Sequence, residues 1–178
     1  QLGEAEKQYN ERMASIDAQI AYAPTAMELL KNQTRTVDAP LNGTYPRTGK
    51  AITILKTSAG DIRINLIHRH AACNDAAFEK LIEAKYFNNT SCHRMFNSEQ
   101  GSVLQCGDPT GTGMGDPGFY TPDELPEYLI NAAGAEYGMQ AQQITYPKGT
   151  VAVANSGPNT GSGQFFIALT DTQLAPSY

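Results

Sequence analysis

Apolar side chains recur at steps of three and four residues along the first part of the chain, with charged and polar residues between them. The apolar positions are Leu2, Ala5, Tyr9, Met13, Ile16 and Ile20. This spacing predicts an amphipathic helix over residues 1–22. We expect Pro24 to end it, because proline lacks an N–H and its ring clashes with the preceding turn. A second short helix is predicted over residues 25–31. The segment is interpreted either as a stalk or partner-binding helix, or as a spacer that lies on the domain or frays.

Proline and glycine break this pattern over the next eighteen residues. The breakers are Pro40, Gly43, Pro46 and Gly49, and they stand among Asn and Thr residues. Such a composition is typical of a linker, because these residues favour turns over regular structure. We therefore divide the chain into a helical segment over residues 1–31, a linker over 32–49 and a domain over 50–178.

Alternating apolar and polar residues open the domain. They predict strands over residues 51–57 and 62–66, and the turn residues between them indicate a hairpin. A helix is then expected over residues 76–85, with Asn74 and Asp75 as candidate caps. Beyond it, short apolar segments predict further strands, and a short helix is considered over residues 127–133.

Two of these later strands, over residues 91–96 and 103–106, precede a glycine-rich stretch over residues 107–118. A phosphate-binding loop is an alternative interpretation of that stretch. We consider it weak, because the Gly-Lys-Ser/Thr ending is missing and no helical pattern follows at once.

A denser pattern closes the chain: a strand-like run over residues 151–154, a loop over 155–163, and two adjacent phenylalanines. Side chains alternate between the two faces of a strand, so Phe165 and Phe166 must point in opposite directions. We expect Phe165 to enter the core and Phe166 to line a pocket.

Composition and charge limit the classes of function and of ligand that the chain can have. The chain has 178 residues and a net charge of −5, which does not suggest a nucleic-acid partner. The three cysteines allow three reduced thiols or one bridge, and the sequence leaves both open. His68 and His70 could share a face, but no further ligand is evident, so we expect a solvated strand end and no metal.

Two motifs stand in order within the domain. The first combines Cys-His-Arg over residues 92–94, Val-Leu-Gln-Cys-Gly-Asp over 103–108 and Gly-Thr-Gly over 111–113. The second reads Ala-Asn-Ser-Gly-Pro-Asn-Thr-Gly-Ser-Gly-Gln-Phe-Phe-Ile over 154–167. Together they resemble the cyclophilin family of peptidyl-prolyl cis-trans isomerases. The resemblance covers residues 50–178 and implies a mainly β fold, a closed eight-stranded antiparallel barrel with flanking helices.

The resemblance also implies that strands are missing from the C-terminal side. The family's barrel continues for several dozen residues beyond the position of Tyr178. A barrel without its last strands would expose an edge and core side chains. We therefore expect the rest of the natural protein, or a second chain, to complete it.

The activity implied is cis-trans isomerisation of X–Pro bonds in peptides and unfolded proteins, without a cofactor. Arg94 matches the family's catalytic arginine, Gln105 the glutamine that holds it, and Phe166 the floor of the proline pocket. The residues expected to bind substrate are Val103, Gly113, Ala154, Asn155, Thr160 and Leu174. His93 should point away from Arg94 and is interpreted as structural. The alternative function is a catalytically weak adaptor that binds proline-containing segments.

Some positions depart from the family pattern. Ser102 stands where an aromatic pocket residue is usual, which implies a shallower pocket. Leu174 replaces a tryptophan associated with cyclosporin, so we expect weak cyclosporin binding at best. Cys92 and Cys106 replace Phe and Gly near the facing ends of two strands, where they could pair if oxidised.

Localisation is inferred from the segment that precedes the domain. No apolar stretch approaches the length of a membrane span. A chain that begins with Gln1 rather than Met is expected to be a processed product. With a helix and linker before the domain, we expect an extracytoplasmic protein tethered through a removed N-terminal segment, with the cytoplasm as the alternative.

Overall fold

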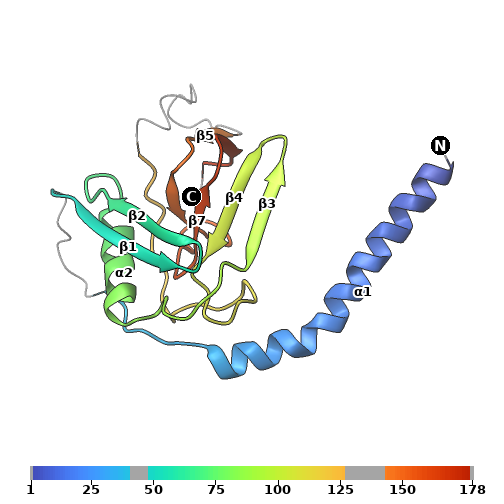
Figure 1. Cartoon of the computed structure of the whole chain (residues 1–178), viewed down its shortest axis with the longest axis horizontal. Coiled ribbons are helices and arrows are strands. Elements are labelled where there is room, and N and C mark those ends of the chain that lie inside the picture. The colour runs from blue at the N-terminus through green and yellow to red at the C-terminus, as the bar shows by residue number, and fades with distance from the viewer. Residues whose placement is uncertain (1, 41–47, 127–142, 177–178) are drawn as a thin grey trace.

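The computed structural model describes residues 2–40, 48–126 and 143–176 of the chain, and within them the domain is mainly β (Figure 1). The elements in chain order are α1 (Leu2–Gln33), β1 (Ala51–Thr57), β2 (Gly60–Leu66), α2 (Ala72–Glu83), β3 (Arg94–Ser98), β4 (Gly101–Cys106), β5 (Ile144–Tyr146), β6 (Val151–Val153), β7 (Phe165–Ala168) and β8 (Thr172–Leu174). The helix considered over residues 127–133 lies outside the described residues.

The strands pair in three groups, all of them antiparallel: β1 with β2, then β3-β4-β7-β6 in that order, and β5 with β8. Within the described ranges these groups do not join into a closed barrel. The mainly β fold is therefore observed, and barrel closure is not. The β5–β8 pair was not predicted, because three-residue strands give too short an alternation to recognise.

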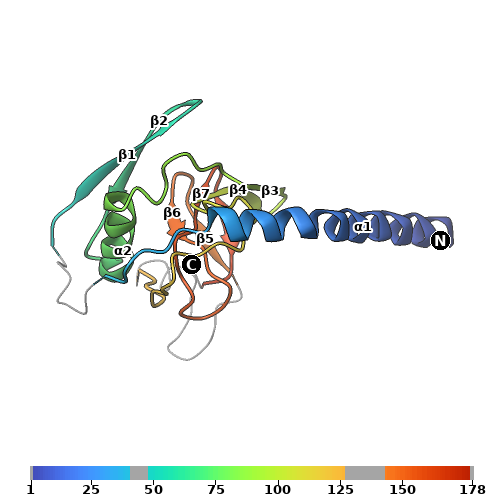
Figure 2. The ribbon, with the colours of Figure 1, turned by 90° about the horizontal axis from the view of Figure 1, so that it is seen from below.

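The N-terminal segment is one helix, and the expectation that Pro24 ends it was wrong. A proline removes one backbone donor, and in an exposed helix water can satisfy the carbonyl that this donor would have bonded. The helix continues and bends part-way along its length, as Figure 1 shows. Figure 2 shows from a second side that α1 leads away from the domain. In the described part of the chain, neither helix is long and apolar enough to cross a bilayer.

The predicted hairpin is present, with Thr57 opposite Gly60 at its turn. Its two strands differ in burial. Ile64 and Leu66 of β2 enter the core, whereas Ile52 and Ile54 of β1 lie on an exposed face. The isoleucines of β1 therefore lack the cover that the β2 residues have.

The helix α2 begins at Ala72, four residues before the predicted start, and neither Asn74 nor Asp75 caps it. Its first turn is capped from a distant loop instead. The Glu124 carboxylate accepts hydrogen bonds from the Cys73 N–H (3.1 Å) and the Asn74 N–H (2.8 Å). Such a carboxylate satisfies donors that the helix itself leaves unpaired and complements its dipole.

The expectation of a solvated His68 was also wrong, since this side chain is buried under α2. Its Nδ1 lies 3.2 Å from Asp75 Oδ2, and its Nε2 lies 3.8 Å from Glu79 Oε1. Burial raises the pKa of Asp75 to about 6, although the neighbouring His68 acts to lower it. The ends of β2 and α2 therefore meet around a buried polar pair.

Two apolar clusters lie on opposite sides of the four-stranded sheet. Phe165 belongs to the cluster formed with β2 and α2, and its ring centroid lies 5.4 Å from that of Phe78. Phe166 belongs to the cluster formed with β5 and β8, and its centroid lies 5.9 Å from that of Tyr146. The prediction that the two phenylalanines point to opposite faces is confirmed, but Phe166 is buried and lines neither cavity. The sheet therefore has a core face and a second face that can carry a site.

Candidate active site

A row of side chains crosses the four-stranded sheet on its second face. Arg94 of β3 is opposite Gln105 of β4, which is opposite Phe166 of β7, which in turn is opposite Ala152 of β6. Residues directly opposite in antiparallel strands share a face. Strand pairing thus brings together the three residues predicted to be catalytic.

A chain of hydrogen bonds runs from this row into the glycine-rich loop. Arg94 Nη1 donates to Gln105 Oε1 at 3.4 Å, and Gln105 Nε2 donates to Gln164 Oε1 at 2.9 Å. The Gln164 Nε2 donates to the carbonyls of Gly113 and Gly115, both at 3.0 Å. Because its Nε2 is occupied by Gln164, Gln105 presents its carbonyl oxygen to Arg94. The network fixes which way the Gln105 amide faces.

The residue Gln164 is buried and was missed in the sequence analysis. The available signal was a polar residue directly before an apolar strand. That signal alone could not show that its amide would reach both Gln105 and the glycine loop, because these partners lie about fifty or more residues away in sequence.

The glycine loop is wrapped around the fully buried carboxylate of Asp108. This carboxylate accepts hydrogen bonds from the Thr110 N–H and hydroxyl and from the N–H groups of Gly113 and Gly115. Burial alone would raise the pKa of Asp108, but these hydrogen bonds outweigh it and hold the pKa below its usual value. Asp108 stays ionised, and the loop stays closed around it.

A cavity of about 350 Å³ opens beside this network. It is lined by residues of the two glycine-rich loops and the network: Gln105, Gly113, Met114, Gly115, Asp116, Tyr120, Ala154, Asn155, Ser156, Thr160, Ser162 and Gln164. Five of the residues predicted for the site therefore line this one cavity: Gln105, Gly113, Ala154, Asn155 and Thr160. Arg94, Val103, Phe166 and Leu174 do not line this cavity.

The predicted proline pocket is filled by the protein's own side chains. Phe166 is only 4% exposed. Val103, Ala154 and Leu174 pack against its cluster, which also contains Tyr146. Phe166 and Val103, which were predicted to form the floor and a wall of the proline pocket, thus lie together beside the polar cavity, and Ala154 connects the two because it packs on this cluster and also lines the cavity.

The loop over residues 155–161 is closed by its own side chains. The Thr160 hydroxyl donates to the Gly157 carbonyl (2.7 Å) and accepts from the Ser156 N–H (2.8 Å). Asn155 Oδ1 accepts from the Gly157 N–H at 3.3 Å. The Ala154 N–H donates to the Gln164 carbonyl at 2.9 Å, so this donor serves the fold. Substrate docking on the main chain of Asn155 stays a prediction.

Two further residues have structural positions. Both ring nitrogens of His93 are buried without a hydrogen-bond partner among the described residues. Burial lowers the pKa of His93, although the Asp108 carboxylate acts to raise it. Ser102 does not line the cavity: its hydroxyl donates to the Phe96 carbonyl, and its N–H to the Thr172 hydroxyl. Ser102 therefore joins β4 to neighbouring segments, and its effect on the depth of the proline pocket stays a prediction.

A disulfide joins Cys92 to Cys106, and its Cα atoms lie 4.0 Å apart. Of the alternatives that the sequence left open, the structure has the single bridge. Cys106 directly follows Gln105, and Cys92 stands two residues before Arg94, so the bridge pins β3 to β4 beside the row. In the ranges that the structure describes, no group of three or more His, Cys, Asp and Glu side chains could hold a metal ion.

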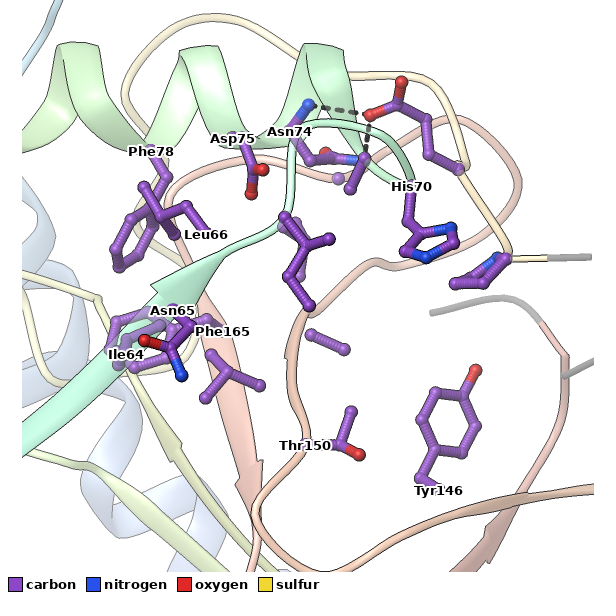
Figure 3. A pocket seen from close by; sticks show the side chains of 18 of the residues that line it. Ile64, Asn65, Leu66, His70, Asn74, Asp75, Phe78, Tyr146, Thr150 and Phe165 are labelled. Carbon is purple, nitrogen blue, oxygen red and sulfur yellow. Dashed lines mark hydrogen bonds between the residues drawn. The ribbon is translucent and has the colours of Figure 1, made fainter. Parts of the chain in front are cut away.

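A second cavity, of about 360 Å³, lies between β2, α2 and β6 (Figure 3). The close view shows the rings of Phe78 and Phe165 on one side of it and that of Tyr146 on another. Asp75 also borders it. Apart from Asn155, none of the residues predicted for the site lines this space.

Residues 52–176 match the family described as "Cyclophilin type peptidyl-prolyl cis-trans isomerase/CLD", and the chain belongs to that family. A protein of Mycobacterium tuberculosis named "Probable peptidyl-prolyl cis-trans isomerase B" is 34% identical over 166 residues, which are 93% of this chain and 52% of the relative. Its namesake in Mycobacterium leprae is 37% identical over 88% of this chain and 51% of the relative. The chain thus spans about half the length of these relatives.

Human "Peptidyl-prolyl cis-trans isomerase-like 1" is 35% identical over 67% of this chain and 63% of its own length. A crystal structure of a cyclophilin-type peptidyl-prolyl cis-trans isomerase from Cryptosporidium parvum superposes with a TM-score of 0.51. It covers 71% of this chain and 75% of that one, at 25% identity. These similarities agree with the mainly β fold described above.

Proposed function

We propose that this chain catalyses the cis-trans isomerisation of X–Pro bonds in peptides and unfolded proteins. The observation that carries the proposal is the row Arg94–Gln105–Phe166, in which a cation, an oriented amide and an apolar side chain share one face of the sheet. Membership of the cyclophilin family and the names of the mycobacterial relatives support the same reaction.

The reaction needs no nucleophile. Rotation about the prolyl C–N bond meets a barrier of about 18–20 kcal/mol, because resonance gives that bond double-bond character. In the twisted state the prolyl nitrogen regains a lone pair. A fixed cation with hydrogen-bond donors near this nitrogen stabilises that state more than the planar amide, which is the condition for catalysis.

Arg94 supplies this cation in our proposal. Its guanidinium stays charged and presents a planar fork of donors. One donor already contacts the oriented Gln105 carbonyl oxygen, so the fork is held over the sheet while other donors can meet the substrate. The cluster around Phe166 would receive the proline ring once Leu174 and its neighbours make room.

The test compares Arg94→Ala with Arg63→Ala in an isomerisation assay on a short X–Pro peptide. Arg63 is a matched control, because it is also an exposed arginine on a strand and lies away from the row. Loss of a comparable transition-state donor costs roughly 10²–10³-fold in rate. We expect that fall for Arg94→Ala and none for Arg63→Ala. A chain that binds proline peptides without accelerating their isomerisation would instead be the adaptor.

We further propose that additional strands, from a longer form of the protein or a second chain, close the sheets into a barrel. Exposed apolar side chains support this: Ile52 and Ile54 on β1, and Met95 on β3. The second cavity, bordered by Phe78 and Phe165, would receive core side chains (Figure 3). A longer form should protect the β1 amides from hydrogen exchange, and unchanged exchange would contradict the closure.

A further inference from the structure

A regular seam of apolar residues runs along α1. Seven positions recur at alternating steps of four and three residues: Tyr9, Met13, Ile16, Ile20, Ala23, Met27 and Leu30. This is a repeat of 3.5 residues, the period that keeps a seam facing a partner helix when two helices supercoil. A helix packed on a globular domain usually has a broader apolar stripe, with a third or fourth apolar position in every two turns.

The seam is exposed from Tyr9 to Met27, and only Leu30 is half-buried. Tyr9, Ile20 and Met27 are 63%, 66% and 64% exposed, and α1 leads away from the domain (Figures 1 and 2). Helices in proteins draw most of their stability from packing an apolar face. An exposed row of this length and period therefore indicates an interaction surface for another helix.

Two charged residues beside the seam indicate which helix packs against it. With Tyr9 and Ile16 at heptad positions d, Arg12 takes position g and Asp17 takes position e. In a parallel, in-register pair of helices, a g residue faces the partner's e residue five positions further along. Arg12 of one copy then meets Asp17 of the other, twice by symmetry. Among the described residues, neither has an ion-pair partner within its own chain.

We propose that two copies of this chain associate through α1 as a parallel two-stranded coiled coil. The outer face is suited to water, where Lys7 Nζ lies 4.0 Å from Glu11 Oε1. Pro24 takes position e, beside the seam, at a point where a proline bends a helix. The two helices therefore pack against each other from Tyr9 to Ala23, and their last turns, beyond Pro24, separate. Both domains lie at the same end of the coiled coil.

The first test is the mass of the full chain by sedimentation equilibrium at tens of micromolar. The monomer is 19.2 kDa, and we expect about twice that value. Ile20→Glu places a charge in each side of the seam and should raise the dissociation constant at least tenfold. Ala18→Glu introduces the same charge at an exposed outer position and should leave the dimer intact. A monomeric parent chain, or a dimer that survives Ile20→Glu, would overturn the proposal.

The second test addresses the orientation. Arg12→Glu and Asp17→Lys should each weaken the dimer, because each puts two like-charged pairs along the seam. An equimolar mixture should restore it, since the glutamate introduced in one chain then faces the lysine introduced in the other, and the remaining Arg12 faces the remaining Asp17. In an antiparallel dimer, g faces g and e faces e. An antiparallel parent dimer therefore has no Arg12–Asp17 pair to lose. Single variants that dimerise as well as the parent chain, or a mixture that fails to recover the dimer, would exclude the parallel arrangement.

Discussion

The two faces of the sheet β3-β4-β7-β6 differ, because one is covered by an apolar core and the other carries polar and apolar side chains together. The face towards β2 and α2 is closed by aromatic packing, with the ring centroid of Phe165 5.4 Å from that of Phe78 and 5.6 Å from that of Phe87. The other face carries the row in which the polar Arg94 and Gln105 are followed by the apolar Phe166. The same four strands thus serve as the wall of a core on one side and as the base of a site on the other.

The difference between the two faces shows how stability and activity can be separated in one small domain. Neighbouring residues on a strand point to opposite faces, so adjacent substitutions test different properties. Changes on the core face should act on the free energy of unfolding. Changes on the site face should act mainly on turnover. The predictions that follow start from the core face and end in the network of the site.

The largest effect is expected from Phe165→Ala. Removing a buried phenylalanine costs about 3–5 kcal/mol of unfolding free energy, through lost burial and the cavity left behind. Urea denaturation should show this loss, while kcat/KM per folded molecule stays near the parent value. Phe166→Ala is the matched neighbour and should lose stability and turnover together, since Phe166 belongs to the site row. Equal activity losses in the two variants would contradict the separation of the faces.

The disulfide should come next. Cys92 and Cys106 are separated by 14 residues, and closing a loop of about 15 residues removes roughly 3 kcal/mol of unfolded-state entropy. Cys92→Ser should therefore lower the unfolding free energy by about that amount. Cys73→Ser keeps the bridge and serves as the control, with a change below about 0.5 kcal/mol expected. Equal stability of the two variants, by urea titration, would show that the bridge adds nothing.

The division between the faces could be predicted from the sequence, whereas several contacts that support it could not. Alternation along a strand is a local rule, so the opposite directions of Phe165 and Phe166 were predicted correctly. Arg94 and Gln105 were found from their motif, and strand pairing brings them together. These features depend on neighbours in sequence or on a pattern that includes them.

The features that were missed depend on distant partners. Glu124 caps α2 from about fifty residues away, so the local cap candidates were wrong. Gln164 connects Gln105 to the glycine loop by two sets of long-range hydrogen bonds. His68 is buried because α2 covers it. Pro24 is tolerated because the helix around it is exposed. In each case the surroundings in the folded protein determine the role of the residue, and the local sequence preference alone could not predict it.

A pH dependence is expected from the core side, near α2. Burial raises the pKa of Asp75 to about 6, against the opposing effect of His68, while Glu79 and Glu124 raise it further. The folded state therefore holds this proton more tightly than the unfolded state. The contribution of Asp75 to the free energy of unfolding should be fully present below about pH 4 and should fall by about 3 kcal/mol as the pH rises through 6. Urea titrations across this range measure it.

Two matched variants test this pH dependence. Asp75→Asn should remove the fall in unfolding free energy between pH 4 and 6, and Asp61→Asn is the control. Asp61 lies exposed near the hairpin turn, and its replacement should leave the fall in place. A fall that persists in Asp75→Asn would assign it to another group. Turnover of the folded protein should not follow this titration, because Asp75 faces away from the Arg94 row.

The smallest effect is expected from Gln164, which supports the site face of the sheet. Gln164 acts on Arg94 only through Gln105, so Gln164→Ala should release the Gln105 amide from its fixed orientation. A hydrogen bond of this kind is worth about 0.5–1.5 kcal/mol, which corresponds to a fall in kcat/KM of about tenfold or less. Since both glutamines belong to one chain of contacts, the double variant with Gln105→Ala should lose little more than Gln105→Ala alone. Additive losses would mean that Gln164 reaches the substrate by itself, through the cavity that both residues line.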